Sequence, residues 1–160
     1  MHLRPIKLLA TLTLSLFSMV AFAQSENPFL GTWDVDFRQS DFGSAAVPME
    51  LSRTYSDLGN GNYMYLVVTM NQDGTHSASS ASYSYSGEQY PIASLDQLEA
   101  ARISYRRINE STVEYTVRLG DEVSQIGAKF ISPNYQQLTI AIQFPDSDQN
   151  DQILVFNRRR

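Results

Sequence analysis

The sequence predicts an all-β protein, a single antiparallel up-and-down β-barrel of about nine strands with at most one short helix. Three observations predict this class. Apolar and polar residues alternate with period two through nearly all of the chain after Pro28, as in strands with one buried face. Short turn sequences separate the alternating segments at even intervals. No long connection indicates the crossing of a sandwich, and closure removes the exposed sheet edges that invite aggregation.

The first strand is expected at Thr32–Phe37, where Trp33, Val35 and Phe37 share one face. The segment Ser40–Pro48 has the composition of a loop. The other expected strands are Leu51–Tyr55, Tyr63–Met70, Thr75–Ser86, Arg102–Ile108, Thr112–Leu119, Val123–Ser132, Gln137–Phe144 and Gln152–Arg158.

Turn residues support several of these boundaries. Asp73-Gly74 is a strong hairpin signal, because both residues accept the backbone angles of tight turns. Ser94 would cap a short helix through Leu95 and Leu98, and this is the one helical segment that we expect after residue 23.

Residues 1–23 are expected to be a signal peptide. Arg4 and Lys7 precede an apolar run, Leu8–Phe22, which ends in Ala21-Phe22-Ala23, the pattern of small residues that signal peptidase accepts. A retained membrane anchor is the alternative, but the run is shorter than the roughly 20 apolar residues of a spanning helix. We therefore expect cleavage after Ala23, a periplasmic or secreted location in a bacterium, and one mature domain, residues 24–160.

Composition and charge exclude several partner classes. The chain has a net charge of −5 with 12 basic and 17 acidic residues, and loss of Arg4 and Lys7 would make the balance more acidic. Nucleic acids and anionic membranes need a basic face, so neither is expected as a partner, and we expect no membrane insertion after cleavage. The sequence has no cysteine, so the fold cannot depend on disulfide bonds.

The two ends of the domain carry a recognisable pair of motifs. Gly31-Thr32-Trp33 stands at the start of the first strand, and Arg158 ends Val155-Phe156-Asn157-Arg158. This pairing resembles the calycin superfamily, the barrels that include lipocalins and fatty-acid-binding proteins. The resemblance implies that the last strand returns beside the first, with a guanidinium over the indole face, a contact worth roughly 0.5–2 kcal/mol.

The middle of the chain resembles a narrower set, bacterial secreted lipocalin-like proteins of unassigned function. The matching stretches are Tyr85–Pro91, Ser104–Ile108 and Ser132–Ile140. In that set we expect Asp-Gly at two turns, where this chain has Ser86-Gly87 and Asn134-Tyr135. The resemblance implies a barrel with a cavity, and it implies no reaction.

No motif predicts catalytic residues, a metal site or a cofactor. His76 is the one histidine after residue 23, and it follows a turn, so an exposed side chain is the expected state. Asp146–Asp151 places oxygen-bearing side chains as a calcium loop does, but Asp151 and Asn157 stand where glycine and glutamate are needed. A solvated acidic turn is therefore the default interpretation.

Tyrosine is the informative excess, because its flat apolar ring and single hydroxyl suit a pocket for an amphipathic molecule. The period-two rule puts Tyr83 with Tyr85, and Tyr105 with Arg107, on common faces. The candidate lumen residues are Tyr83, Tyr85, Tyr105, Arg107 and Tyr115, with Arg53 and Tyr55 as additions. The alternative is that tyrosines cover the outside of the barrel, while Ser82 and Ser84 face inward.

Three functions remain open from the sequence. The first is an exported binding barrel for a small apolar or amphipathic ligand; an arginine buried in it would need an anion, supplied by a ligand carboxylate if no Asp or Glu lies opposite. The second is a structural or interaction barrel with a fully packed interior. The third is an enzyme that uses Tyr, Arg and Glu in the lumen. A cavity of a few hundred Å³ would favour the first over the second.

Overall fold

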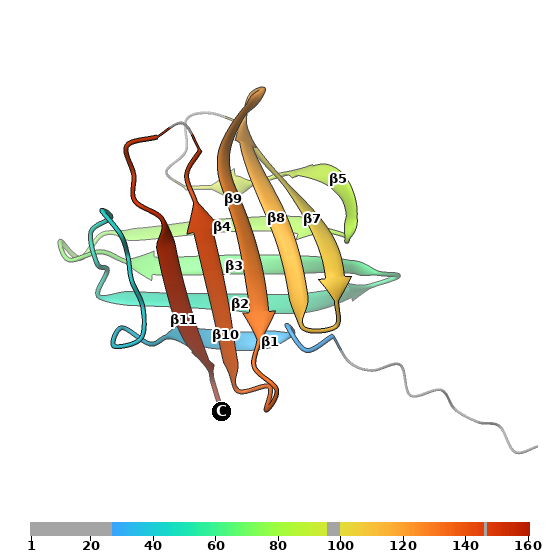
Figure 1. Cartoon of the computed structure of the whole chain (residues 1–160), viewed down its shortest axis with the longest axis horizontal. Coiled ribbons are helices and arrows are strands. Elements are labelled where there is room, and N and C mark those ends of the chain that lie inside the picture. Colours follow the sequence, from blue (N-terminus) through green and yellow to red (C-terminus); the bar gives the residue numbers. More distant parts are fainter. Residues whose placement is uncertain (1–26, 96–99, 146) are drawn as a thin grey trace, which may run out of the picture.

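A computed structural model describes residues 27–95, 100–145 and 147–160, which form one antiparallel sheet of 11 strands and contain no helix (Figure 1). The strands are β1 (Gly31–Val35), β2 (Glu50–Gly59), β3 (Asn62–Met70), β4 (His76–Tyr83), β5 (Ser86–Pro91), β6 (Ala93–Ser94), β7 (Ala101–Asn109), β8 (Thr112–Leu119), β9 (Glu122–Ile131), β10 (Gln137–Gln143) and β11 (Gln152–Arg158).

The sheet is an up-and-down meander that bends until it nearly closes. Its strand order is β5-β7-β8-β9-β10-β11-β1-β2-β3-β4-β6, so the first strand, β1, pairs with the last, β11. In Figure 1, β1–β4 run across behind β7–β11. The sheet edges are β5 and β6; β4 lies near β5 and β7 without ladder pairing to either. The expected fold class, an antiparallel barrel, is confirmed.

The β1–β11 seam is held by a contact between Trp33 and Arg158, which face each other in register. The guanidinium lies 4.0 Å from the centre of the indole ring, inside the limit of about 6 Å for a cation–π contact. Arg158 also donates to the carbonyls of Pro28, Leu30 and Tyr135 at 2.6–2.8 Å. The Trp33 indole N–H donates to the Phe29 carbonyl at 2.9 Å.

Gly31 makes room for this contact. Its φ of +111° lies in a region that favours glycine, and a Cβ there would lie 2.8 Å from Nη1 of Arg158. The structure therefore requires a glycine at this position of the Gly-x-Trp motif for two reasons, the backbone angle and the closeness of the Arg158 guanidinium.

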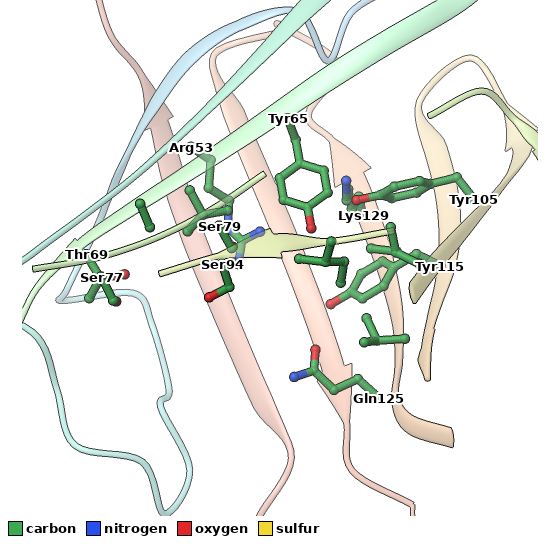
Figure 2. A pocket seen from close by; sticks show the side chains of 15 residues that line it. Arg53, Tyr65, Thr69, Ser77, Ser79, Ser94, Tyr105, Tyr115, Gln125 and Lys129 are labelled. Carbon is green, nitrogen blue, oxygen red and sulfur yellow. The ribbon is translucent and has the colours of Figure 1, made fainter. Parts of the chain in front are cut away.

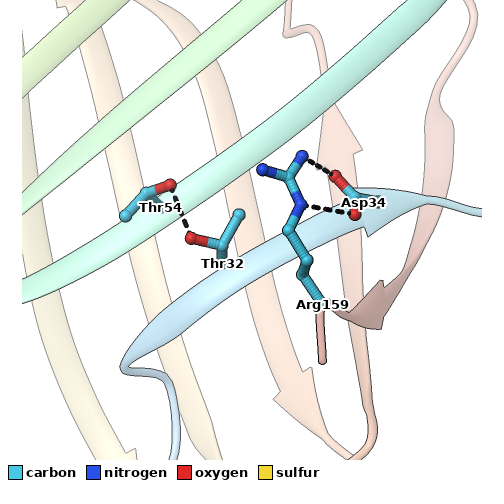
Figure 3. A network of polar contacts seen from close by, with 4 residues as sticks. All are labelled: Thr32, Asp34, Thr54 and Arg159. Carbon is cyan, nitrogen blue, oxygen red and sulfur yellow. Dashed lines mark hydrogen bonds and ion pairs between the residues drawn. The ribbon is translucent and has the colours of Figure 1, made fainter.

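The outer face of the seam has its own polar contacts (Figure 3). Arg159 pairs with Asp34 through both carboxylate oxygens, which ties the residue after β11 to β1. Thr32 and Thr54 share a hydrogen bond of 3.1 Å between β1 and β2. Arg158 on the inner face and Arg159 on the outer face thus both tie the end of β11 to β1.

Two strands were not expected from the sequence. The predicted strand Thr75–Ser86 instead ends at Tyr83, and the chain turns through Ser84 and Tyr85 into β5, which pairs with β7 rather than β3. Gly87, with a φ of +84°, lies where the β5–β7 register shifts. Alternation continues through this break because Tyr83 and Tyr85 both pack against the core. The count is consequently 11 rather than about nine.

The helix expected after Ser94 falls mainly on residues 96–99, which lie outside the described residues, and Ser94 itself belongs to β6. Within the described residues, no helix is long and apolar enough to cross a membrane. The expected signal peptide, residues 1–23, also lies outside them.

The most deeply buried apolar side chains come mainly from β1, β10 and β11 and from the segment just before β1. Trp33, Phe29, Leu138, Ile140 and Phe156 are almost completely buried. Inward positions alternate along each strand, as in β8, where Val113, Tyr115 and Val117 are buried and their neighbours are not. This packing leaves the interior between β2–β4 and β7–β9 for polar and aromatic side chains.

Candidate functional site

The barrel interior contains a cavity of about 240 Å³, lined from β2, β3, β4, β6, β7, β8 and β9. Its charged and aromatic lining residues are Arg53, Tyr65, Tyr105, Tyr115 and Lys129. Figure 2 shows these side chains approaching one space from different strands, with Gln125 and the hydroxyl residues Thr69, Ser77, Ser79 and Ser94 around it. The cavity is therefore a mixed site with cations, phenol rings and hydroxyl groups.

Lys129 lies in a cage of tyrosine rings. Its Nζ is 4.2 Å from the ring centre of Tyr105, 4.4 Å from Tyr55, 5.6 Å from Tyr115 and 5.9 Å from Tyr83. The residue is only 2% exposed, and lysine is almost never buried this far without a charged partner. The faces of the tyrosine rings attract an ammonium group, and this attraction replaces part of the stabilisation that a charged partner would give.

Arg53 and Tyr55 present polar atoms with no partner. The Arg53 Nε–H and the Tyr55 hydroxyl are both buried. The two side chains are close enough to interact electrostatically, but neither of these atoms makes a hydrogen bond of normal geometry to any described residue. The Arg53 guanidinium lies 5.5 Å from the ring centre of Phe156. Buried donors left unpaired cost about 1–3 kcal/mol each. Arg53 lines the cavity and Tyr55 does not, so of these two residues only Arg53 presents its side chain to the cavity.

No carboxylate balances the two cations. None of the residues lining the cavity, in the part of the chain that the structure describes, is Asp or Glu. The ion pairs found among the described residues are Arg106–Glu114 and Arg159–Asp34, both at the surface. The interior therefore carries uncompensated positive potential.

Burial moves the pKa values of these groups in opposite directions. Desolvation, followed by repulsion from Arg53, holds the pKa of Lys129 well below its ordinary value of 10.5, because both effects disfavour the ammonium ion. Burial raises the pKa of Tyr65 to about 12 and that of Tyr105 well above 10.0. Burial consequently favours the protonated hydroxyl groups of the tyrosines and disfavours the ammonium form of Lys129.

Gly127 positions one wall of the cage. It faces Tyr115 in the β8–β9 register, and a Cβ on it would overlap the phenol ring. A residue without a side chain lets the ring of Tyr115 lie flat across β9 beside Lys129, two residues along.

The structure brings most of the sequence-predicted lumen residues together. Tyr55, Tyr83, Tyr105 and Tyr115 are all buried and surround Lys129. Arg53, Tyr105 and Tyr115 line the cavity itself. Ser82, the alternative inward residue, is exposed.

Tyr85 and Arg107 lie apart from the cavity. The Arg107 guanidinium is 5.3 Å from the ring centre of Tyr85, whose hydroxyl accepts a hydrogen bond of 3.1 Å from Asn27. Neither residue lines the cavity. Tyr85 and Arg107 were expected to face the lumen because of the alternation along their strands. Alternation fixes the side of a strand on which a residue lies, but not its position along the barrel axis.

Sequence reasoning missed Lys129, the most buried charged side chain in the described residues. Two signals were present. Lys129 shares a strand face with Gly127 and Ile131 by alternation, and it is one of only two lysines in the chain, the other being Lys7.

The metal-site residues considered from the sequence do not gather. His76 is exposed, and Asp146 of the acidic turn lies outside the described residues. Within the described part of the chain, no three His, Cys, Asp or Glu side chains are placed to hold a metal ion.

Comparison with solved structures identifies the architecture. The fold is similar to that in the crystal structure of Rv2717c from M. tuberculosis, with a TM-score of 0.52 and 15% sequence identity, over 83% of this chain and 94% of that one. No protein-family model matches the sequence, and no curated protein matches it. At this level of identity the likeness concerns the fold, which is a near-closed antiparallel β-barrel.

Proposed function

We propose that this protein is an exported binding barrel that holds a small amphipathic molecule in its lumen, with an acidic group of that molecule directed at Arg53. The observation that carries the proposal is a cavity lined by two basic side chains, the buried Lys129 and the half-buried Arg53 with its buried Nε–H, and by no carboxylate among its described lining residues. A buried cation without a counter-ion is costly, and a ligand carboxylate offsets that cost.

An unpaired donor of the site matches such a group. A carboxylate accepts several hydrogen bonds at once, and the Arg53 Nε–H is a buried donor without an acceptor on a residue that lines the cavity. Charge-assisted hydrogen bonds of this kind are about twice as strong as neutral ones.

The remaining walls suit a compact apolar body. Tyr65, Tyr105 and Tyr115 offer ring faces, and Val67, Ile103 and Val117 offer aliphatic contacts. The volume of about 240 Å³ lies just below the range of drug-sized pockets, about 300–1,000 Å³. The ligand is therefore smaller than a drug-sized molecule, which favours a short-chain or single-ring acid.

Calorimetric titration with hexanoate and with 1-hexanol tests the proposal, since the two probes share an alkyl chain and differ in charge. We expect hexanoate to bind about 10–100-fold more tightly, which corresponds to one or two charge-assisted hydrogen bonds. Arg53→Met should remove that preference. Arg102→Met, at an exposed position on β7, is the control and should retain it.

Equal affinities for the two probes would contradict the acidic specificity. Absence of binding by either probe would favour a packed barrel instead. The export part of the proposal has a separate test: N-terminal sequencing of the protein recovered from outside the cytoplasm should begin at Gln24, and a start at Met1 in that fraction would refute cleavage.

A further inference from the structure

Lysine is almost absent from this protein, yet one lysine stands in its interior. The chain has ten arginines and two lysines, Lys7 and Lys129. The first of these falls within the expected signal peptide. The second is 2% exposed and lines the cavity. The one amine-bearing side chain of the barrel is thus withheld from the surface and presented to whatever enters the lumen.

We propose that Lys129 is a covalent capture site, whose Nζ forms an imine with the carbonyl group of an aldehyde bound in the barrel. The inference rests on the proposed function to the extent that the aldehyde must enter the same lumen.

The geometry around Nζ favours attack on a carbonyl carbon. Lys129 projects from β9 into the wall of the cavity, between the rings of Tyr105 and Tyr55 at 4.2 and 4.4 Å (Figure 2 shows the former). Neither ion pair of the described residues involves Lys129, so no carboxylate holds it as an ammonium ion. A planar aldehyde can lie against the same ring faces that surround the amine.

The amine is also chemically available. A lysine is activated as a nucleophile when it is desolvated or placed near another cation, and Lys129 meets both conditions because it is buried beside Arg53. The tyrosine rings oppose this by favouring the ammonium ion. Loss of hydration disfavours the ammonium ion, and repulsion from Arg53 adds to that effect. Burial and repulsion together lower the pKa of Lys129 below its ordinary value.

The reaction consumes no oxidant or reductant. The Nζ lone pair forms the new C–N bond while the carbonyl π electrons move to oxygen, and a proton passes from nitrogen to that oxygen to give a carbinolamine. Loss of the hydroxyl as water then gives the C=N bond. One amine and one aldehyde therefore yield one imine and one water molecule.

Tyrosine hydroxyls can assist the second step. Tyr65, Tyr105 and Tyr115 line the cavity with Lys129, and burial keeps them protonated by raising the pKa of each. A protonated phenol can donate a hydrogen bond to the departing hydroxyl. The restricted access of water to a buried site then slows hydrolysis of the imine.

Borohydride trapping tests the capture site. The purified full-length or naturally processed chain is incubated with benzaldehyde at neutral pH, reduced with sodium borohydride and analysed by intact-mass and peptide mass spectrometry. We expect one benzyl group on Lys129, formed at least tenfold faster than on Nα-acetyl-lysine in the same mixture. The α-amino group, and Lys7 where it is present, are separated from Lys129 by peptide mapping.

Two variants sharpen the test. Lys129→Met should abolish the internal adduct, and a retained unfolding transition shows that the variant is folded. Arg53→Met removes the neighbouring cation, so the pH for half-maximal labelling of Lys129 should move upward. In the Arg102→Met control, Lys129 should be labelled to the same extent and with the same pH dependence as in the unmodified protein.

The outcomes separate this inference from the proposed function. Labelling confined to the α-amino group or Lys7, with hexanoate still bound, overturns imine capture and leaves the binding barrel intact. Labelling of Lys129 without hexanoate binding overturns the acid preference and supports capture. Failure of both hexanoate binding and Lys129 labelling overturns both.

Discussion

At the scale of single residues, the barrel interior holds one arginine and one lysine for which the described residues supply no carboxylate partner. Lys129 is surrounded by phenol rings, and Arg53 has a buried Nε–H without an acceptor. Both arrangements lower the stability of the empty protein, since a buried cation without an anion is unfavourable. Such a cost is typical of residues kept for a ligand.

The cost of Lys129 predicts a pH-dependent stability difference. Its pKa is lower in the folded state than the value of 10.5 expected in the unfolded chain, so the unfolded state binds more protons between those two values. Stability then rises with pH across that window, by at most about 1.4 kcal/mol per pH unit. Lys129→Met removes the effect.

Urea unfolding of both proteins between pH 6 and 10 would measure this difference. As pH rises, the free energy of unfolding of the unmodified protein should increase relative to that of Lys129→Met. The contribution of the tyrosines cancels in this comparison, because their pKa values are raised in both proteins. At neutral pH the variant should be at least as stable. A constant difference across the range would show that Lys129 keeps its ordinary pKa.

Tyr55→Phe should measure the cost of an unpartnered hydroxyl. The Tyr55 hydroxyl is buried without a hydrogen bond of normal geometry, so its removal should leave the free energy of unfolding unchanged or raise it by up to about 1 kcal/mol. Tyr85→Phe is the contrasting variant: it loses the bond from Asn27 and should cost about 1 kcal/mol. Thermal unfolding compares the two, and a destabilised Tyr55→Phe protein would contradict an unpartnered hydroxyl.

At the scale of strands, alternation predicted most elements and the inward tyrosines, and it failed where pairing changes. The pattern cannot show that the chain leaves β4 after Tyr83, because Ser84 and Tyr85 continue it without interruption. The exchange of partner from β3 to β7 is decided by the curvature of the whole sheet. In the same way, the neighbours of Lys129 come from four strands, β2, β4, β7 and β8, which no local pattern brings together.

Gly127→Ala tests the fit between β8 and β9. The added methyl group would overlap the Tyr115 ring, so we expect a loss of about 1–3 kcal/mol, as in other overpacked cores. In a Tyr115→Ala background the same change should cost much less, and a double-mutant cycle of urea unfolding measures the coupling. Additive effects would show that the ring does not depend on the glycine.

At the scale of the whole molecule, the barrel depends on the contact between its first and last strands. The sequence resemblance implied this seam, and β1 and β11 are paired in the structure. The seam joins residues more than a hundred positions apart, through Arg158 and its bonds to the carbonyls of Pro28 and Leu30.

Arg158→Met should destabilise the protein by about 2–4 kcal/mol, because it removes charge-assisted bonds to three carbonyls and the contact with Trp33. Arg160→Met, at an exposed position, should change the free energy of unfolding by less than about 0.5 kcal/mol. The Trp33 fluorescence reports unfolding in both variants. Equal stabilities would mean that β-sheet pairing alone holds the seam.

The β1–β11 seam also constrains when the protein can fold during its synthesis. Trp33 precedes Arg158 by more than a hundred residues, so the seam cannot form until the ribosome has translated β11. A meander can pair its hairpins as they emerge, but the barrel stays open until β11 is available to pair with β1. Pairing between such distant segments is slow. The nascent chain therefore remains unclosed while β1 to β10 are made, and it gains the stability of the seam only after β11 has left the ribosome.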